Sequence, residues 1–382
     1  MFCPEYSEIQ SQIRETASKF AREAILPTAV ERDIKSEFPR EIITKLGELG
    51  FMGMMVDPEW NGSGLDAVSY AIAIEEICKI DASVGIVLSV QNSLVNWILE
   101  HFGSGYIKEK YLKPLADGSY IGAYCLSEPE AGSDASRQHT VAVHKGNMWE
   151  LNGTKNWISS AHSADVYVVF AQTNIELGHK GIGCFLIEKG TPGFVPGQKE
   201  DKMGMRSSDT SSIGLTNVMV PEENLIGEIG GGFRIAMESL NGGRIGIAAQ
   251  AVGIAQGAFD LAVRYARERY TFGKPIIEHQ MIQHKLARMS ADISAARLLV
   301  HKAAYMKEMH MNYARASAEA KLFAATVAND VAREAVQIHG GYGYVREYQV
   351  ERMMRDAKVT EIYEGTSEIQ SIVIAREIMK NS

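Results

Sequence analysis

The acidic residue with the most suggestive surroundings is Glu364, in the segment Val359–Gln370 (VTEIYEGTSEIQ). Gly365 follows it directly, and Ser367-x-x-Gln370 has the spacing of a capping box, which predicts that a helix begins here. A carboxylate on a loop beside a helix N-terminus, if sheltered from water, can act as a general base. Burial would raise the pKa of this carboxyl and the helix end would lower it. The alternative is a solvated acid in a loop that leads into the helix.

Two further segments combine polar side chains with an aromatic ring or a glycine. In Tyr124–Ser136 (YCLSEPEAGSDAS), hydroxyls and backbone N–H groups surround Gly132 and could bind a flat polar ring or a phosphate. The alternative is an ordinary turn with Asp and Ser side-chain hydrogen bonds. In Asn156–Ser160 (NWISS), a Trp next to hydroxyls could stack on an aromatic cofactor, or it could fill the core at a strand end.

Basic and glycine-rich residues stand together in the C-terminal half. Arg264–Gln280 carries several basic side chains beside Gly273, which could meet a pyrophosphate or form a solvated basic turn. Gln337–Tyr344 (QIHGGYGY) contains Gly340 and Gly341, where a ligand or another backbone can approach closely.

Composition and missing motifs exclude several classes of protein. Of the 382 residues, 46% are hydrophobic, and 39 Lys and Arg against 47 Asp and Glu give a net charge of −8. This balance argues against binding nucleic acid or anionic lipid, and without an unbroken apolar run of about 18 residues we expect no transmembrane helix. There is no GxGxxG after a strand, Walker loop, HExxH or GxSxG motif, and no histidines at metal-ligand spacing.

Cysteine usage and the N-terminus bear on the compartment. Cys3, Cys78, Cys125 and Cys184 are scattered without a CxxC pair, which is typical of a reducing compartment and predicts neither disulfides nor a zinc site. The first twenty residues lack an apolar secretory core and form an amphipathic helical pattern. We therefore expect a bacterial cytoplasmic protein, or a mitochondrial matrix protein whose leader has been removed.

The elements that must position these segments divide the chain into three regions. Residues 1–118 are predicted to be helical, 119–225 to form a β domain, and 226–382 to form a helix bundle that prolines scarcely interrupt. Strands are expected at about 141–143, 148–151, 166–171, 182–187 and 213–220. Helices are expected at about 65–79, 83–102, 233–268, 279–308 and 313–337.

Six segments together resemble the acyl-CoA dehydrogenase family in type, order and spacing: YCLSEPEAGSD, NGTKNWISS, GRIGIAAQAVGIAQGAFD, RYTFGKPI, QIHGGYGY and YEGTSEIQ. The resemblance spans nearly the whole chain and is strongest to the short-chain and short/branched-chain members, such as butyryl-CoA dehydrogenase. It implies a mostly α fold with a central β domain: an N-terminal helical domain, a middle β-barrel domain and a C-terminal helix bundle. It also implies a homotetramer with one FAD per subunit.

The resemblance further implies roles for individual residues. Glu364 matches the catalytic base; some relatives instead place a base just before Arg244, where this chain has Gly243. The residues that match FAD contacts, some of them to a neighbouring subunit's flavin, are Tyr124, Leu126, Ser127, Gly132, Ser133, Trp157, Ile158, Ser159, Arg269, Gln280, Gln337, Gly340, Gly341, Thr366 and Glu368. The residues that match substrate contacts are Ser133, Asn241, Arg244 and Gly365. No metal site is implied, and Asn241 departs from the Asp of other short-chain members.

The implied reaction is α,β-dehydrogenation of an acyl-CoA thioester, with electrons passed to an electron-transfer flavoprotein. Two alternatives stay open: the same site run as an enoyl-CoA reductase, and a non-catalytic family member that acts as a binding protein. Val90–Trp97 is a candidate wall of the acyl pocket, with Gln91 and Asn92 either facing the pocket or pairing with a neighbouring element. One or two methylenes are worth only about 1–3 kcal/mol, so butyryl, isobutyryl and 2-methylbutyryl chains are not distinguished.

Overall fold

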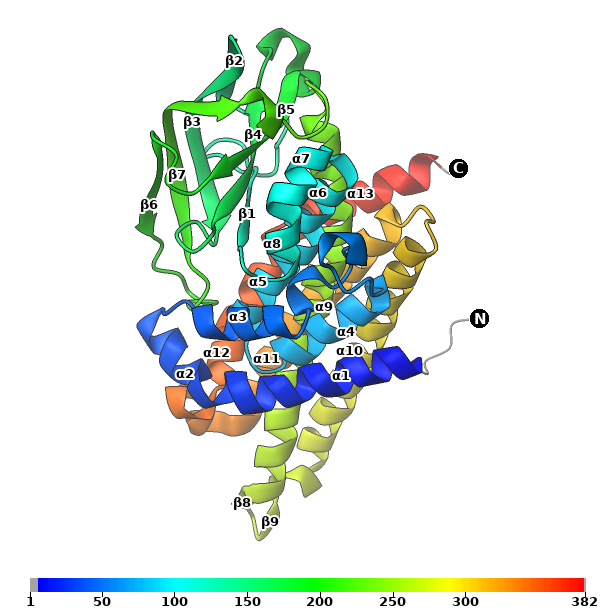
Figure 1. The fold of residues 1–382 in the computed structure, drawn as a ribbon. Helices are drawn as coiled ribbons and strands as arrows, with labels where there is room; N and C mark the ends of the chain where they lie inside the picture. The colour runs from blue at the N-terminus through cyan, green and yellow to red at the C-terminus, as the bar shows by residue number, and fades with distance from the viewer. Residues whose placement is uncertain (1–5, 381–382) are drawn as a thin grey trace.

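Long helices form the C-terminal part of the computed structural model, which describes residues 6–380 and leaves Cys3 outside. These helices are α9 (Gly232–Glu268), α10 (Gln280–Glu308) and α11 (Ala314–His339), and α9 and α11 pack along each other (Figure 1). Their bounds agree with the expected ranges because Pro275, between α9 and α10, is the only proline after Pro221.

Shorter helices form the N-terminal part. They are α1 (Glu8–Phe20), α2 (Leu26–Lys35), α3 (Arg40–Glu48), α4 (Ala67–Cys78), α5 (Ala82–Ser89), α6 (Trp97–Phe102), α7 (Gly105–Ile107) and α8 (Lys113–Ala116). Between α5 and α6 the chain stays helical through a π-helical stretch, Val90–Asn96. Gly50 follows α3 with φ +76°, as expected for the C′ residue of a helix.

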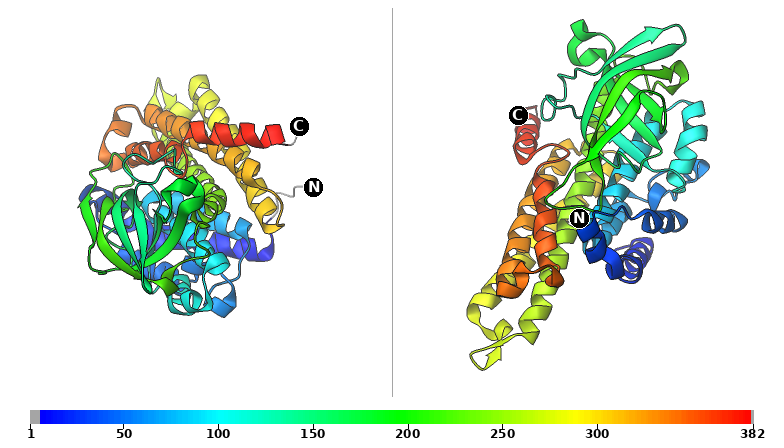
Figure 2. Two further views of the ribbon diagram at one scale, coloured as in Figure 1. Left: turned by 90° about the horizontal axis from the view of Figure 1, so that it is seen from above. Right: turned by 90° about the vertical axis from the view of Figure 1, so that its left-hand side faces the viewer.

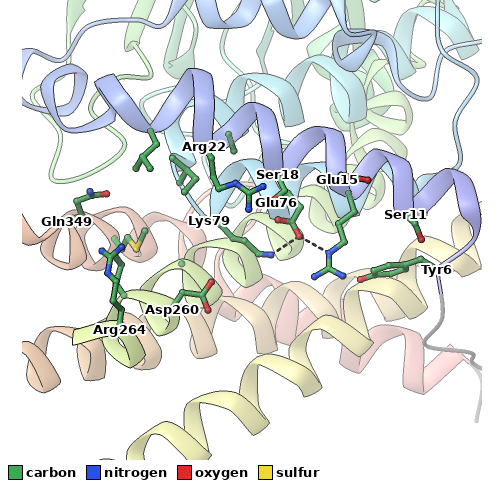
Figure 3. Close-up of a pocket in the computed structure, with 17 residues that line it drawn as sticks. Tyr6, Ser11, Glu15, Ser18, Arg22, Glu76, Lys79, Asp260, Arg264 and Gln349 are labelled. Atoms are coloured by element: carbon green, nitrogen blue, oxygen red, sulfur yellow. Dashed lines mark hydrogen bonds and ion pairs between the residues drawn. The ribbon is translucent and has the colours of Figure 1, made fainter. Parts of the chain in front are cut away.

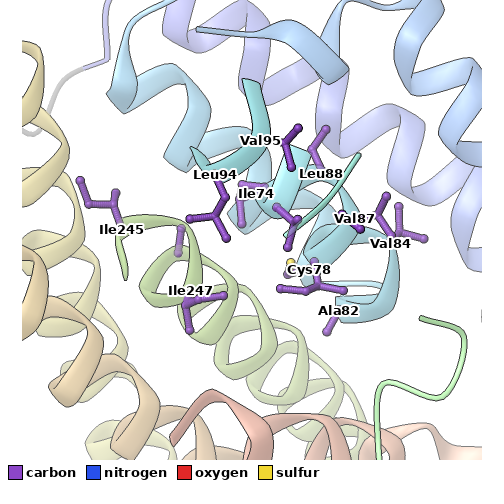
Figure 4. Close-up of a cluster of buried hydrophobic side chains, with 14 of the residues drawn as sticks. Ile74, Cys78, Ala82, Val84, Val87, Leu88, Leu94, Val95, Ile245 and Ile247 are labelled. Atoms are coloured by element: carbon purple, nitrogen blue, oxygen red, sulfur yellow. The ribbon is translucent and has the colours of Figure 1, made fainter. Parts of the chain in front are cut away.

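α9 joins the N-terminal helices to the C-terminal bundle through a common apolar core. Side chains from α4, α5 and the π-helical stretch face Ile245 and Ile247 of α9 (Figure 4). A Cβ at Gly253 would lie 2.5 Å from the Glu75 carbonyl oxygen, so only glycine permits this approach of α9 to α4. The core therefore fixes α9 tightly against the N-terminal helices.

The stretches Ala82–Phe102 and Gly232–Glu268 have the length and apolar character of membrane spans, which the sequence analysis did not anticipate. Of their apolar windows, 94% and 78% are buried inside the molecule. We therefore interpret both as core helices.

A curled sheet lies between the two helical parts in the sequence and at one end of the molecule (Figure 2). Its strands are β1 (Gly122–Cys125), β2 (Val141–Lys145), β3 (Met148–Ser159), β4 (Val166–Gln172), β5 (Ile182–Glu188), β6 (Phe194–Lys199) and β7 (Thr210–Pro221). Their order is β1-β4-β2-β3-β7-β6, with β5 paired to β4. β2 and β3 form the expected hairpin, in which Lys145 pairs with Met148 and Gly146 has φ +67°.

The structure adds strands that the sequence analysis missed. β1 has only four residues, and β6 contains Pro196 and Gly197, which weaken a strand pattern. A small hairpin, β8 (Tyr270–Thr271) and β9 (Lys274–Pro275), lies at the opposite end of the molecule from the large sheet (Figure 1). The chain ends with α12 (Val350–Lys358) and α13 (Ser367–Lys380). The predicted helical, β and helical arrangement is confirmed.

Candidate active site

Glu364 lies on a strained turn between α12 and α13. Its φ is +52°, a left-handed conformation that costs a non-glycine residue energy, and Gly365 follows with φ +94°. Two side chains hold this turn: Lys321 Nζ donates to the Gly365 carbonyl at 2.7 Å, and Gln370 Nε2 donates to the same oxygen at 2.8 Å. These bonds come from α11 and α13, so both helices fix the conformation of Glu364.

The predicted capping box at Ser367 and Gln370 is wrong. The hydroxyl of Thr366 accepts the hydrogen bond from the backbone N–H of Ile369 at 3.3 Å, so the cap lies one residue earlier. The Gln370 side chain instead turns to the carbonyls of Glu364 and Gly365. Its amide therefore stabilises the strained turn rather than the helix end.

The carboxylate of Glu364 is enclosed by protein. Within residues 6–380, both of its oxygens are buried and neither has a hydrogen-bond partner. Burial raises the pKa of Glu364 to about 7, and the positive charges of Lys321 and Arg244 oppose this rise. Desolvation therefore outweighs the neighbouring charges, and the group titrates near neutral pH.

The middle of α9 forms the wall opposite Glu364. A Cβ at Gly243 would lie 2.2 Å from Glu364 Oε2, so the carboxylate occupies the space that any larger residue would need. Arg244 follows Gly243 and is buried, and its Nη1 donates to Asn241 Oδ1 at 2.7 Å. The structure thus brings together Glu364, Gly365, Asn241 and Arg244.

The Val90–Trp97 stretch contributes one apolar side chain to this site. Leu94 Cδ2 would lie 3.0 Å from a Cβ at Gly243. The prediction that Gln91 and Asn92 line the pocket is not supported, because both are buried against backbone groups. Gln91 accepts from the N–H of Gly122 at 2.9 Å, and Asn92 accepts from the N–H of Met54 at 2.8 Å. They pair with neighbouring elements instead.

Tyr124 lies on β1 and Trp157 on β3, and of the two Tyr124 is within electrostatic reach of Glu364. The Tyr124 hydroxyl is buried near Ser239 and is left without a hydrogen bond among the described residues, and its phenol lies within electrostatic reach of Glu364 and Arg244. Trp157 is 62% exposed and has φ +60°. A buried free hydroxyl and an exposed Trp on a strained backbone both suit a ligand that the protein binds here.

A buried ion pair holds the loop after β1 against β3. Lys155 Nζ lies 2.7 Å from Glu128 Oε1, and Glu128 also accepts backbone N–H groups of His139 and Thr140 at 2.6 and 3.0 Å. The loop carries Leu126, Ser127, Gly132 and Ser133, and β3 carries Trp157, Ile158 and Ser159. The Asn156 N–H donates to the Ser127 carbonyl at 2.8 Å, so these predicted residues lie on adjoining segments.

Another group of predicted cofactor residues lies elsewhere. Arg269, Gly340 and Gly341 line an open cavity of 750 Å³ at the end of α9, and the Arg269 guanidinium lies 5.7 Å from the ring centre of Tyr342. Gln280 begins α10 and Gln337 lies in the last turn of α11. One chain therefore does not bring these residues to Glu364, whereas Thr366 and Glu368 stay near it at the start of α13.

Glu128, Lys155 and Lys321 were not among the residues predicted from the sequence. Lys321 falls on the apolar stripe of α11 that includes Ser317, Ala324 and Ala328, and all of these positions are buried. The sequence signal that could have revealed Lys321 is its place on this stripe, because a lysine is buried there only if a specific partner accepts its hydrogen bond.

A further cavity of 680 Å³ lies between α1, α4 and α9 (Figure 3). In it Glu76 pairs with Arg14 at 3.1 Å and with Lys79 at 2.7 Å. None of the predicted site residues lines this cavity. In the described part of the chain, no group of His, Cys, Asp or Glu side chains has the arrangement of a metal site.

Comparison with known proteins matches family models along almost the whole chain. The models are the acyl-CoA dehydrogenase N-terminal domain over residues 7–119, the middle domain over 123–218 and the C-terminal domain over 230–379. The chain is 47% identical to the short-chain specific acyl-CoA dehydrogenase of Clostridium acetobutylicum, over 97% of this chain and 98% of that protein. It is 45% identical to the mitochondrial short-chain specific enzyme of Rattus norvegicus, over 99% of this chain and 92% of that protein.

Solved structures share the fold closely. Butyryl-CoA dehydrogenase from Megasphaera elsdenii superposes with a TM-score of 0.97 at 45% identity, covering 99% of this chain and 100% of that one. A chain from a study of the electron transferring flavoprotein of Acidaminococcus fermentans superposes with a TM-score of 0.98 at 47% identity, covering 99% and 100%. PigA with FAD and proline gives 0.96 at 29% identity, covering 100% of both chains.

Proposed function

Because this chain belongs to the acyl-CoA dehydrogenase family, we propose that it oxidises a short or short branched-chain acyl-CoA thioester to the trans-2-enoyl-CoA. The electrons pass to an electron-transfer flavoprotein. The observation that carries this proposal is the Glu364 carboxylate, which is buried without a hydrogen bond among the described residues and has a pKa of about 7. A carboxylate with these properties is well suited to remove a proton at neutral pH.

Glu364 is the residue that we assign as the base for the α-proton. Its carboxylate lies against Gly243 of α9, which supplies no competing side chain. The backbone N–H of Glu364 is positioned by the same strained turn and is a candidate donor to the thioester oxygen, where negative charge develops as the proton leaves. The rigid turn would thus hold both the proton-accepting carboxylate and the N–H that donates to the thioester oxygen, because both belong to Glu364.

We propose that the chain binds FAD, because the residues of the site fit this flavin. The Tyr124 hydroxyl lacks a partner among the described residues, Trp157 is exposed, and a Cβ added at Gly132 would meet no atom within 4 Å. The residues that would hold the ring and its substituents are Tyr124, Leu126, Ser127, Gly132, Ser133, Trp157, Ile158, Ser159, Thr366 and Glu368. When bound, the flavin would accept the hydride from the β-carbon.

The substrate segment would lie along α9 beside Glu364. We assign Ser133, Asn241, Arg244 and Gly365 to the acyl-CoA, with Leu94 on the apolar side of the acyl group. The buried Arg244 side chain leaves its Nε without a partner among the described residues, which suits a polar ligand group. A short chain is supported by the names of the relatives, two of which are short-chain specific enzymes and one a butyryl-CoA dehydrogenase.

A homotetramer explains the separate group of Arg269, Gln280, Gln337, Gly340 and Gly341. These residues line or flank an open cavity that Thr271 of the β8–β9 hairpin also lines, and this hairpin lies at the opposite end of the molecule from the large sheet (Figure 1). We propose that they bind part of the FAD of a neighbouring subunit. Phe272, at the turn of the β8–β9 hairpin beside them, is 96% exposed and is a candidate contact between subunits.

We further propose domain boundaries at 1–118, 119–225 and 226–382, close to the ranges that the family models match. Cys78, Cys125 and Cys184 are buried and free, which is typical of a reducing compartment. This supports the bacterial cytoplasm, or the mitochondrial matrix in view of the mitochondrial relatives.

The decisive experiment is anaerobic titration of the purified yellow protein with butyryl-CoA, isobutyryl-CoA and 2-methylbutyryl-CoA, followed by flavin absorbance. Rapid bleaching by one of them would establish the reaction and the preferred chain. Glu364→Gln should retain flavin and bind the same thioester yet bleach at least about a thousandfold more slowly. Bound flavin that no short thioester bleaches would contradict the proposed substrate, and rapid bleaching in Glu364→Gln would contradict the assigned base.

A further inference from the structure

Lys321 is a fully buried lysine beside the proposed base. It is 0% exposed, and its Nζ donates to the Gly365 carbonyl at 2.7 Å. Lys321 forms no ion pair among residues 6–380, whereas the equally buried Lys155 pairs with Glu128 at 2.7 Å, and lysines are almost never fully buried unless paired. Its position therefore calls for a specific reason.

Its hydrogen bond alone does not supply that reason. Gln370 Nε2 donates to the same Gly365 carbonyl at 2.8 Å, so a neutral amide already gives that oxygen one hydrogen bond. What Lys321 adds is a positive charge on α11, near a carboxylate that has no hydrogen bond of its own among the described residues. We propose that Lys321 is a positioning residue that holds the Glu364–Gly365 turn and keeps Glu364 ionised through its buried positive charge.

The charges around Lys321 and Glu364 support an electrostatic interaction between them. Among the acids that act on Lys321, Glu364 has the largest effect, ahead of Glu361 and Glu368, while Arg244 on α9 opposes it. Burial lowers the pKa of Lys321 to about 8, so the ammonium form still predominates at neutral pH. Conversely, Lys321 has the largest opposing effect on the raised pKa of Glu364.

The remaining groups that face Glu364 cannot replace this charge. Tyr70 on α4, Tyr124 on β1 and the adjacent Tyr363 all have phenols whose pKa burial raises, so they are neutral at working pH. Arg244 is a cation, but it bonds Asn241 at 2.7 Å and is assigned to the substrate. Lys321 is therefore the positive charge on α11 that stabilises the ionised form of Glu364.

Two other lysines, the buried Lys155 and the partly exposed Lys307, show that this arrangement is specific. Lys155 has an ion-pair partner, Glu128, at 2.7 Å. Burial also lowers the pKa of Lys307 to about 8, but the acids that act on it are Glu308 and Glu100. Lys307 therefore provides a matched control: a desolvated lysine whose charge is not directed at Glu364.

The test compares Lys321→Met, Lys321→Arg and Lys307→Met in the FAD-loaded enzyme. The readout is the pH dependence of anaerobic flavin reduction by a saturating short acyl-CoA. Since the base must be ionised, the rate falls as pH drops through the pKa of Glu364. We expect Lys321→Met to move the midpoint upward by about one pH unit and, because the wild-type midpoint lies near pH 7, to slow the reaction about fivefold at pH 7. Lys321→Arg should restore the midpoint, and Lys307→Met should leave it unchanged.

A second readout needs no turnover. The difference in melting temperature between a protein that keeps Glu364 and its Glu364→Gln counterpart reports the ionisation of Glu364 as the pH changes. Measured in the Lys321→Met background, this difference should reach its plateau at a higher pH than in the wild-type background. If Lys321→Met does not fold, Lys321→Gln, which keeps a donor and removes the charge, gives the same comparison.

This inference rests on Glu364 as the base, and the two can fail separately. A folded Lys321→Met enzyme with an unchanged midpoint and an unchanged melting difference overturns the role of Lys321, whatever its absolute rate. Rapid flavin reduction by Glu364→Gln overturns the assignment of the base instead, while leaving the melting comparison to test the charge interaction.

Discussion

At the scale of single residues, the site keeps Glu364 where its charge is disfavoured. The pKa rises from 4.5 to about 7, which corresponds to about 3 kcal/mol of stability. Because the folded-state pKa is the raised one, this stability is present at pH values below about 4.5 and is lost as the pH rises to about 7. Retaining such a residue is typical of function rather than of stability.

We expect Glu364→Gln to melt about 3–4 °C higher than the wild type at pH 8, since the neutral amide escapes the penalty. The difference should grow between pH 5 and pH 7 and level off above pH 7. Differential scanning calorimetry across this range measures it. A constant difference at every pH would mean that Glu364 does not titrate near neutrality.

Gly243 is required by contact rather than by backbone conformation. It lies within a helix, where alanine is normally favourable, but an added Cβ would be 2.2 Å from Glu364 Oε2. We expect Gly243→Ala to displace the carboxylate and slow flavin reduction about 100-fold, with FAD content unchanged. Gly242→Ala is the matched control, because the nearest atom to its Cβ would be Lys307 Nζ at 3.5 Å and the loss should be far smaller.

At the scale of elements, the loop after β1 depends on the Glu128–Lys155 pair. Removing one partner leaves a buried charge uncompensated, so Lys155→Met should lose about 3–5 kcal/mol of stability and release FAD more readily. Adding Glu128→Gln should recover part of the loss, because the amide oxygen can still accept the N–H groups of His139 and Thr140. Thermal melting measures the change in stability and flavin content measures the release of FAD. If the stability loss of the double variant equals the sum of the losses of the two single variants, Glu128 and Lys155 are not coupled.

The sequence predicted the long helices better than the short elements. α9, α10 and α11 begin and end near the expected residues because apolar periodicity runs unbroken across each of them. The missed strand β1 is short, and its pairing with β4 is set by contacts far along the chain. The residue pattern within β1 does not indicate which distant strand it pairs with.

In the site, too, local motifs indicated some residues, whereas contacts between distant segments were not predictable. Motifs indicated Glu364, Tyr124 and Trp157 as candidate site residues, and the structure brings Tyr124 within electrostatic reach of Glu364. The capping box was misplaced by one residue because Gln370 bonds to the strained turn, an option that spacing alone does not reveal. Lys155 and Lys321 escaped notice because only the folded chain brings them to Glu128 and Gly365.

At the scale of the whole molecule, the predicted FAD residues form two groups that a single chain keeps apart. We therefore expect flavin retention and subunit association to depend on each other. In sedimentation velocity recorded at protein and flavin wavelengths, flavin should travel only with the multi-subunit species. A flavin-bearing monomer would contradict the shared site.

Arg269→Ala should weaken FAD retention several-fold while leaving flavin reduction in the loaded fraction nearly unchanged, because Arg269 is remote from Glu364. Arg288→Ala, an exposed arginine of α10 that pairs with Asp292 at 3.4 Å, is the control. Flavin content after gel filtration measures the effect. Full occupancy in Arg269→Ala would remove that residue from the cofactor site.

The length of α9 sets the distance between the two groups of predicted site residues. Arg244, beside the base, and Arg269, at the helix end, are 25 positions apart, which is about 37 Å along a straight helix. Inserting one residue between Gly253 and Arg269 would rotate everything beyond it by about 100° and advance it by about 1.5 Å. The number of residues in this part of α9 therefore sets both the distance and the angular relation between Arg244 and Arg269.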